Sequence, residues 1–545
     1  MRRRLATILP LSGWVALRRL VLIGVALPFV FLLFGLTGEE SEHWRQVRSH
    51  MLPTYIWETA VTVGGSVTLA ALIGISLAWC VALHAFPGRR AFEVILLLPL
   101  AIPAYISAYT YDGLLGYTGA IQAALRNHLR IDVNDYGFSA PRMANAIFIF
   151  AIAYYPYIYI FARTYLRNHG ASMLESAMLL GGVRGRIFFR VILPLLRPSL
   201  IAGGTLVCLE VLNDYGVTSY FGIHTFTTAI FAAWFGMGET ASAVKLALLL
   251  LAAVLAILLA SKALQRVGRY HLASGKEKGC RPRKLEGLGA AGAFFLCFSA
   301  AAVCFLIPAA QMLAWARMVW DASIIASLLP DFWKTLFVAG GASLMIMALA
   351  SASAVACHAY PGRLSKLAAQ AASIGYAIPA AVLAIGAVTL FARIDGMIVR
   401  FAVGFLRVPL GMTVWLLLYA YVVRFFSIGY QAVEGGYLKI GNLRSEVSRV
   451  LGRGPTMTFL LVELPMLRNA IISGSILVFV DIIKELPLTL ILRPFNFNTL
   501  GTRAYEFANN EAIPETSLPA LAIVAISAAF VALMQLRNER SETSC

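Results

Sequence analysis

The sequence is poor in charged residues, and most of those it has are basic. Asp, Glu, Lys and Arg make up 13% of the 545 residues, whereas 59% are hydrophobic. Charged residues form about a quarter of an average soluble domain. So little charge cannot cover the water-facing surface of so large an apolar chain. The composition therefore excludes an ordinary soluble globular protein.

Several signatures of chemistry are also missing from the sequence. The seven cysteines are scattered, with no C-x-x-C pair and no disulfide framework. The chain has no G-x-x-x-x-G-K-[ST] phosphate-binding loop, no tightly spaced set of metal ligands and no nucleophile–base pair. We therefore expect no catalytic residue, no metal site and no cofactor bound by this chain.

Long apolar runs are what the sequence has instead. Several reach the roughly 20 residues that a helix needs to cross the hydrocarbon layer. Clear examples are Val21–Leu36, Val61–Leu83, Ala144–Phe161, Ala241–Ala260, Ala290–Met312, Leu336–Cys357 and Leu518–Leu536. The sequence predicts an all-α polytopic membrane protein, with about 12 transmembrane helices of this length.

The formal net charge of +18 has two possible explanations. Basic chains often bind nucleic acid. Here the Lys and Arg residues gather on alternate loops, as the positive-inside rule describes for membrane proteins. We therefore expect a lipid bilayer and no nucleic acid as a partner, with both termini in the cytoplasm. The basic start and first apolar run, from Met1, are interpreted as a retained first span and not as a cleaved signal peptide.

The sequence repeats itself. Thr59 corresponds to Thr335, the segment HAFPG to HAYPG, and Gly203 to Gly474. This predicts two six-span units, 1–263 and 289–545, joined by a basic cytoplasmic linker at 264–288. Because each unit has an even number of spans, the repeats should be parallel and enclose a pathway between them. The alternative is a duplication without a shared pore.

Two loops of matching pattern lie at 172–198 and 443–469. Ser172 and Glu175 have capping-box spacing, so a short helix is expected to begin there. Glycines should end each helix, and a Leu-Pro pair precedes the next span. Such a short stiff element suits docking into a groove of a partner protein. The alternative is an interfacial helix that lies on lipid.

Glu175-Ser176-Ala177-x3-Gly181-x9-Val191-x-Leu193-Pro194 resembles the "EAA" loop of ATP-binding-cassette (ABC) importer permeases, and Glu446-Val447-Ser448-x3-Gly452-x9-Val462-x-Leu464-Pro465 is similar to it. The resemblance implies the type I ABC importer permease fold in a bacterial inner membrane. It also implies that these loops couple the permease to an ATPase. The coupling residues would be Glu175, Ala177, Gly181, Leu193, Pro194, Glu446, Gly452, Leu464 and Pro465.

The same resemblance implies the partners. A cytoplasmic ATP-binding subunit, as a dimer, would use the ATP, and a periplasmic substrate-binding protein would deliver the substrate. The segments LEVLNDYGVTSYFGIHTFTTAIFAAWF and YYPYIYIFAR look like those of fused ferric-iron permeases. Thiamine, phosphonate, sulfate and polyamine permeases share the architecture and stay as alternatives.

Acidic residues in or near the spans suggest where the substrate passes. Ionisable groups are costly in lipid, so they should face a cavity or pair with each other. An acidic pathway would suit Fe(III), which prefers oxygen ligands. A proton-coupled secondary transporter, carrying protons on Glu210, Asp214 and Glu485, is the alternative from another class. The candidate pathway residues are Glu210, Asp214, Tyr215, Asp481 and Glu485.

Overall fold

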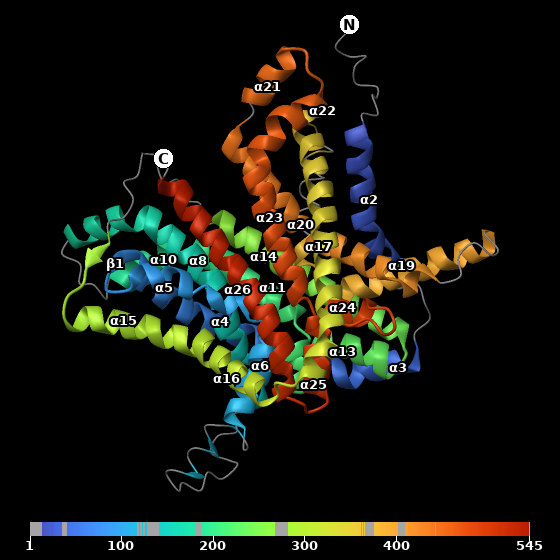
Figure 1. The fold of residues 1–545 in the computed structure, drawn as a ribbon, viewed down its shortest axis with the longest axis horizontal. Coiled ribbons are helices and arrows are strands. Elements are labelled where there is room, and N and C mark those ends of the chain that lie inside the picture. The colour runs from blue at the N-terminus through green and yellow to red at the C-terminus, as the bar shows by residue number, and fades with distance from the viewer. Residues whose placement is uncertain are drawn as a thin grey trace. The chain divides into compact units, whose positions relative to one another are not determined.

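The computed structural model describes residues 13–34, 41–116, 119, 122–123, 126–127, 141–179, 187–267, 282–360, 362, 365, 375–401, 409–441 and 443–543. At 34, 168–179, 266–267, 283, 399–401, 531 and 534–543 it describes the backbone alone. Figure 1 shows that this part of the chain is almost entirely helical. Its strands, β1 (His84–Ala85) and β2 (Arg283–Lys284), form one short parallel pair. The predicted all-α class is confirmed.

Within the described ranges, nine helices are long and apolar enough to cross a membrane. Two bent helix pairs raise the number to eleven if each pair is one span. One bend, of 92°, comes just before Ala104, where Pro103 is extended, and the other, of 61°, comes at Arg197-Pro198. Proline removes a backbone donor and disfavours helix at the residue before it. The predicted polytopic architecture is therefore confirmed.

The chain divides into two compact units, and each draws on both halves of the sequence. Unit 1 consists of Met1–Ser41, Gly238–Leu248 and Ala326–Thr502, and unit 2 of Glu42–Met237, Leu249–Ile325 and Arg503–Cys545. The predicted boundaries 1–263, 264–288 and 289–545 describe a duplication in the sequence and stay a prediction. Most of the linker lies outside the described residues.

Among its described residues, unit 1 has five helices of more than 20 residues, α2 (Gly13–Phe34), α17 (Ala322–Ala359), α19 (Ala380–Phe401), α20 (Val414–Ile440) and α23 (Leu464–Lys484). Its shorter α-helices are α21 (Leu443–Val450), α22 (Pro455–Thr458) and α24 (Pro487–Leu492). The N-terminal helix α2 packs on α19. A Cβ atom at Gly386 would lie 2.7 Å from the carbonyl oxygen of Pro28, so this contact requires glycine. Tyr419 of α20 also donates a hydrogen bond to the carbonyl of Gly24, at 2.6 Å.

Unit 2 has its core where α4 packs along α8 and α11. Its helices are α3 (Glu42–Gln46), α4 (Leu52–Leu83), α5 (Arg89–Ile95), α6 (Ala104–Leu115), α8 (Arg142–Leu179), α10 (Leu193–Leu195), α11 (Arg197–Asn213), α12 (Gly216–Tyr220), α13 (Phe226–Phe231), α15 (Leu288–Ala301), α16 (Ile307–Met318) and α26 (Ser517–Thr543). Helices α14 (Thr240–Val267) and α25 (Leu500–Asn509) run across unit boundaries, as does the first turn of α17.

The duplication is visible in how the helices cross. In unit 2, a Cβ atom at Gly203 of α11 would lie 2.8 Å from Cα of Ile158 in α8. In unit 1, a Cβ atom at Gly474 of α23 would lie 2.7 Å from Cβ of Ala432 in α20. Small residues let helix backbones approach closely in membranes. The repeated glycine therefore preserves the same crossing in both copies.

Candidate functional site

The first loop differs from the expectation at its start. Helix α8 runs without interruption from Arg142 to Leu179, so the prediction that a helix begins at Ser172 is wrong. Gly170 lies inside α8, and one glycine costs a helix only about 1 kcal/mol. Glu175 and Ala177 lie on the last turns of this helix, and their side chains are outside the description. Gly181 lies outside the described residues.

Each loop ends in a π-helical turn directly before its Leu-Pro pair. The turns span Phe188–Ile192 and Phe459–Glu463, at corresponding positions of the repeat. Leu193 and Pro194 then open α10, and Leu464 and Pro465 open α23. Proline has no N–H for the i→i−4 bond, so the turn before it can widen without losing a donor. The repeated Leu-Pro pair is the sequence signal for this turn, although the pattern alone does not predict a π-helical turn.

The second loop exposes an apolar helix face. Leu443, Val447 and Val450 of α21 are 72%, 52% and 86% exposed, and Leu451 beyond its end is 75% exposed. These spacings place the four side chains on one face. Ser445 and Ser448 are buried on the other side, where Ser448 shares a 3.0 Å hydrogen bond with Thr458. Exposed apolar patches of this kind typically contact a partner or a membrane.

Gly452 ends α21 in a Schellman motif. Its N–H bonds to the carbonyl of Arg449 at 3.0 Å, and the N–H of Arg453 reaches back to Ser448 at 3.2 Å. The φ angle of Gly452 is +83°, a conformation that favours glycine. Glu446 lies in the first turn of α21 and is exposed. The Glu-x5-Gly spacing therefore sets the length of the short helix in this copy.

The candidate pathway carboxylates Asp214 and Glu485 occupy equivalent positions and cap equivalent helices. Asp214 Oδ1 accepts a hydrogen bond from the N–H of Val217 at 2.8 Å, at the start of α12. Glu485 Oε1 accepts one from the N–H of Leu488 at 3.1 Å, at the start of α24. A carboxylate at a helix N-terminus is stabilised by the free N–H groups there. Both side chains therefore have a structural role.

Two of the candidate acids are paired with cations inside unit 1. Asp481 lies 3.1 Å from Lys484, one turn along α23. Glu485 and Arg424 are 3.4 Å apart, with side-chain exposures of 8% and 4%. The corresponding position for Arg424 in the first copy is Ala153. These contacts favour the interpretation that Asp481 and Glu485 are structural ion pairs.

The remaining pathway candidates lie in unit 2. Glu210 is partly buried on α11. The ring of Tyr215 stacks on Phe231 at 3.6 Å between centroids, and its hydroxyl accepts a hydrogen bond from Tyr505 at 3.3 Å. Tyr215 is thus fixed by two contacts that no local sequence pattern predicts, one of them from a residue far away in the sequence.

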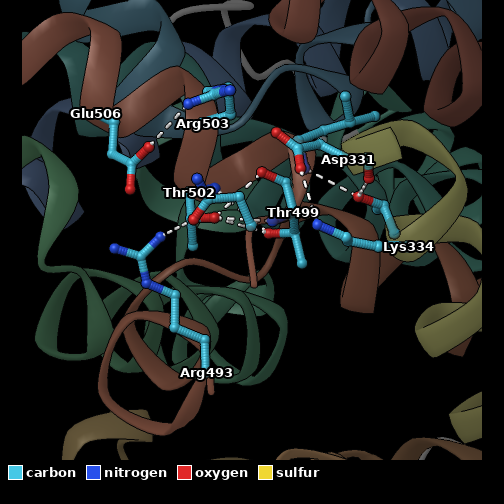
Figure 2. Close-up of polar contacts among 10 residues, drawn as sticks. Asp331, Lys334, Arg493, Thr499, Thr502, Arg503 and Glu506 are labelled. Atoms are coloured by element: carbon cyan, nitrogen blue, oxygen red, sulfur yellow. Dashed lines mark hydrogen bonds and ion pairs between the residues drawn. The ribbon is translucent and has the colours of Figure 1, made fainter. Parts of the chain in front are cut away.

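A pair of threonines caps the helix that begins in the Thr-Phe-Thr-Thr segment, residues 225–228. A corresponding pair of threonines occurs in unit 1. Thr225 and Thr228 cap α13 reciprocally, and Thr499 and Thr502 do the same at the start of α25 (Figure 2). In unit 2 the N–H of Phe226 bonds to Thr59 at 3.3 Å, and in unit 1 the N–H of Leu500 bonds to Thr335 at 2.9 Å. Both helix starts are therefore tied to corresponding long helices, α4 in the first repeat and α17 in the second.

Figure 2 also shows the charged groups around the second copy. Asp331 is buried and lies 3.5 Å from Lys334, whose ammonium group is 5.7 Å from the centroid of Phe497. In the described part of the chain, no three His, Cys, Asp or Glu side chains are grouped so as to hold a metal ion. The polar residues here can anchor helix ends, and they provide no metal centre.

Comparison with known proteins agrees with this architecture. Residues 70–270 match the family of binding-protein-dependent transport system inner membrane components. The chain is 23% identical over 529 residues to the Fe(3+)-transport system permease protein FbpB 2 of Haemophilus influenzae, covering 95% of this chain and 97% of that protein.

Two further relatives match shorter stretches. The molybdenum transport system permease protein ModB of Escherichia coli is 27% identical over 202 residues, 36% of this chain and 86% of that protein. The sulfate transport system permease protein CysT of Salmonella typhimurium is 25% identical over 150 residues, 27% of this chain and 51% of that protein. With the helical fold, these matches make the chain similar to the multi-pass inner-membrane permease components of binding-protein-dependent ABC transport systems.

Proposed function

We propose that this permease imports ferric iron, driven by ATP hydrolysis on a separate subunit. The observation that supports the substrate is the relative named as an Fe(3+)-transport permease, because it matches over nearly the whole of both chains. The molybdenum and sulfate relatives match about a third of this chain or less. They favour an oxyanion as the second candidate substrate.

The proposed coupling to ATP rests on the exposed apolar face of α21. A free helix would gain by burying Leu443, Val447, Val450 and Leu451 in a groove. The chain has no phosphate-binding loop of its own, so the groove would belong to a partner ATPase. Both loops would then dock on the ATP-binding subunits, on the cytoplasmic side. Closure of an ATPase dimer could shift the permease between two packings.

Two of the acidic residues proposed for the pathway are neutralised by cations within unit 1. Asp481 and Glu485 are paired with cations, so they offer less free negative charge to Fe(III) than the sequence suggested. Glu485 is held in place by Arg424 and by the start of α24, which favours a structural role. This observation and the family match both favour an ATP-driven importer over a proton-coupled secondary transporter.

Reconstitution tests the proposal directly. The permease would be placed in liposomes with its ATP-binding subunit and its periplasmic binding protein. We expect Fe(III)-loaded binding protein to stimulate ATP hydrolysis and uptake, and molybdate or sulfate to do neither. Stimulation by an oxyanion would replace the substrate and leave the transport class intact. Uptake that follows a proton gradient and ignores ATP would reject the ATP-driven class itself.

A further inference from the structure

The N-terminal helix α2 contacts the second loop inside unit 1. Trp14 Nε1 donates a hydrogen bond to Thr456 Oγ1 at 2.9 Å. Its indole ring also meets Phe459 edge to face, with centroids 5.7 Å apart and planes at 71°. Thr456 lies in α22 and Phe459 opens the π-helical turn. One side chain from the start of the described chain therefore touches two consecutive parts of the loop.

The loop segment that Trp14 touches is connected to α21. The hydroxyls of Thr458 in α22 and Ser448 in α21 are 3.0 Å apart and buried. A buried hydroxyl that loses its partner is costly, so this pair should stay joined. A shift of α22 would thus reach α21, the helix with the exposed apolar face.

Helix α2 is itself held firmly near Trp14. Arg18, one turn further along, is only 4% exposed and donates a hydrogen bond to Ser365 at 2.6 Å. Val21 belongs to a buried apolar cluster with Tyr430 and Tyr437 of α20. Trp14, Arg18 and Val21 share a helix face. The indole is therefore presented from an anchored helix and not from a loose end.

The loop has a second support on the side of α20. The hydroxyl of Tyr437 donates to Glu463 Oε2 at 2.7 Å, and Glu463 is 4% exposed. The ring of His358, from α17, stacks on Tyr437 with centroids 4.1 Å apart. The stretch from Thr456 to Glu463 is thus fixed from α2 at one end and from α20 at the other.

The first loop has the same aromatic contact from a different source. Phe188, which corresponds to Phe459, meets Trp79 edge to face at 5.0 Å. Trp79 lies in α4, five residues before His84. At the corresponding position before His358, the second copy has the small residue Ser353. In the second copy, Trp14 of α2 therefore makes the aromatic contact that Trp79 of α4 makes in the first copy.

We propose that Trp14 is a positioning residue for energy coupling: it sets the orientation of α21 through Thr456 and Phe459. This inference rests on the proposed function, in which the second loop docks on the ATPase. It adds that the N-terminal helix takes part in coupling although it need not touch the ATPase, the substrate or the binding protein.

A spin-label measurement on the full chain tests the positioning without any substrate. Labels would be placed at Val450→Cys on α21 and Leu438→Cys on α20, in a background without reactive native cysteines. Trp14→Ala should broaden the distribution of distances between them. Trp333→Ala is the matched control, since Trp333 lies in the same unit, on α17, and is 61% exposed. An unchanged distribution in Trp14→Ala would overturn the proposal.

The functional arm uses the complete complex in liposomes. Trp14→Ala should reduce the stimulation of ATP hydrolysis by Fe(III)-loaded binding protein about fivefold or more, as expected for losing one aromatic contact and one hydrogen bond. The ATPase should still copurify. Trp14→Phe and Thr456→Val break the same hydrogen bond, so their effects should not add. Additive effects, or full stimulation in Trp14→Ala, would contradict the proposal.

Gly452→Asp in the same preparation separates the two claims. If Gly452→Asp uncouples the complex and Trp14→Ala does not, the role of Trp14 fails and docking of the second loop stands. If both variants behave as wild type in the liposome assay, the result contradicts both the role of Trp14 and the docking of the second loop on the ATPase.

Discussion

At the scale of single residues, a glycine conformation and a buried ion pair have the clearest structural roles. The sequence identified Gly452 and Glu485 as special, and the structure supplies the reasons. Gly452 has a positive φ angle, and Glu485 is paired with Arg424. The first reason follows from the local pattern, because glycine is the usual residue after a helix of this kind. The second involves a residue distant in sequence and could not be read locally.

Gly452→Asp is expected to uncouple ATP hydrolysis from uptake while the protein still inserts. A Cβ atom there would meet nothing within 4 Å, so the cost is in the backbone, about 1–2 kcal/mol for a left-handed conformation. Asp also adds charge beside the apolar face of α21. The measurement is uptake per ATP hydrolysed in liposomes. Gly452→Asn, which tolerates this conformation and is neutral, should retain more coupling. Equal loss in both variants would argue against the charge effect.

Gly181→Asp is expected to uncouple ATP hydrolysis from uptake in the same way, because Gly181 has the matching position in the first loop.

Arg424→Met is expected to destabilise unit 1 strongly. It would leave the carboxylate of Glu485 buried without its cation, which typically costs about 3–5 kcal/mol. Thermal unfolding of the purified protein in detergent would measure the loss. The double variant Arg424→Met with Glu485→Gln should recover most of it, because the amide oxygen can still cap α24. No recovery would mean that Arg424 acts through other contacts, such as its hydrogen bond to Ile378.

At the scale of elements, the two loops are alike in pattern and different in build. In the first copy, α8 continues to Leu179, whereas in the second copy α20 ends at Ile440 and Gly441 separates it from α21. Gly441 has a φ angle of +70°, which allows the sharp exit from the helix. The motif predicted both loops, but the capping-box signal at Ser172 was overridden by an uninterrupted helix.

Replacing Val450 and Leu451 by serine should weaken association with the ATP-binding subunit at least about tenfold. Burying one such side chain typically contributes about 1.5–3 kcal/mol, and 1.4 kcal/mol corresponds to tenfold in affinity. Copurification of the ATPase from detergent would measure the change. Leu288→Ser is the control, since Leu288 is 93% exposed and lies on α15 in unit 2. If the double serine variant binds normally, α21 lies on lipid instead.

At the scale of the whole molecule, the sequence repeat and the compact units divide the chain differently. Unit 1 needs α2 from the first half of the sequence, and unit 2 needs α15, α16 and α26 from the second. Close contacts make these additions specific, such as Gly386 against Pro28 in unit 1 and Gly113 against Trp315 in unit 2. In a single fused chain, α2 stays covalently connected to unit 1, and α15, α16 and α26 stay connected to unit 2.

Halves expressed separately, as 1–263 and 289–545, should therefore be unstable alone and assemble when expressed together. The second half alone lacks α2, which packs in unit 1, and the first half alone lacks α15, α16 and α26, which pack in unit 2. Size-exclusion chromatography and copurification of differently tagged halves would show the outcome. A half that is monodisperse and thermally stable on its own would contradict the division into units. Removing α2 from the intact chain should reproduce the instability of unit 1.

The sequence by itself determined the helical membrane class, the duplication, the two loops and the lack of an ATP-binding motif, because spans, glycines and Leu-Pro pairs are local signals. The tertiary structure decided which helices share a unit, that α8 runs through Ser172, that Arg424 neutralises Glu485, and that Trp14 reaches Phe459. These features depend on side chains tens to hundreds of residues apart or on helix packing. In a membrane such packing depends on shape and hydrogen bonding more than on hydrophobic pattern, so hydropathy carries little record of it.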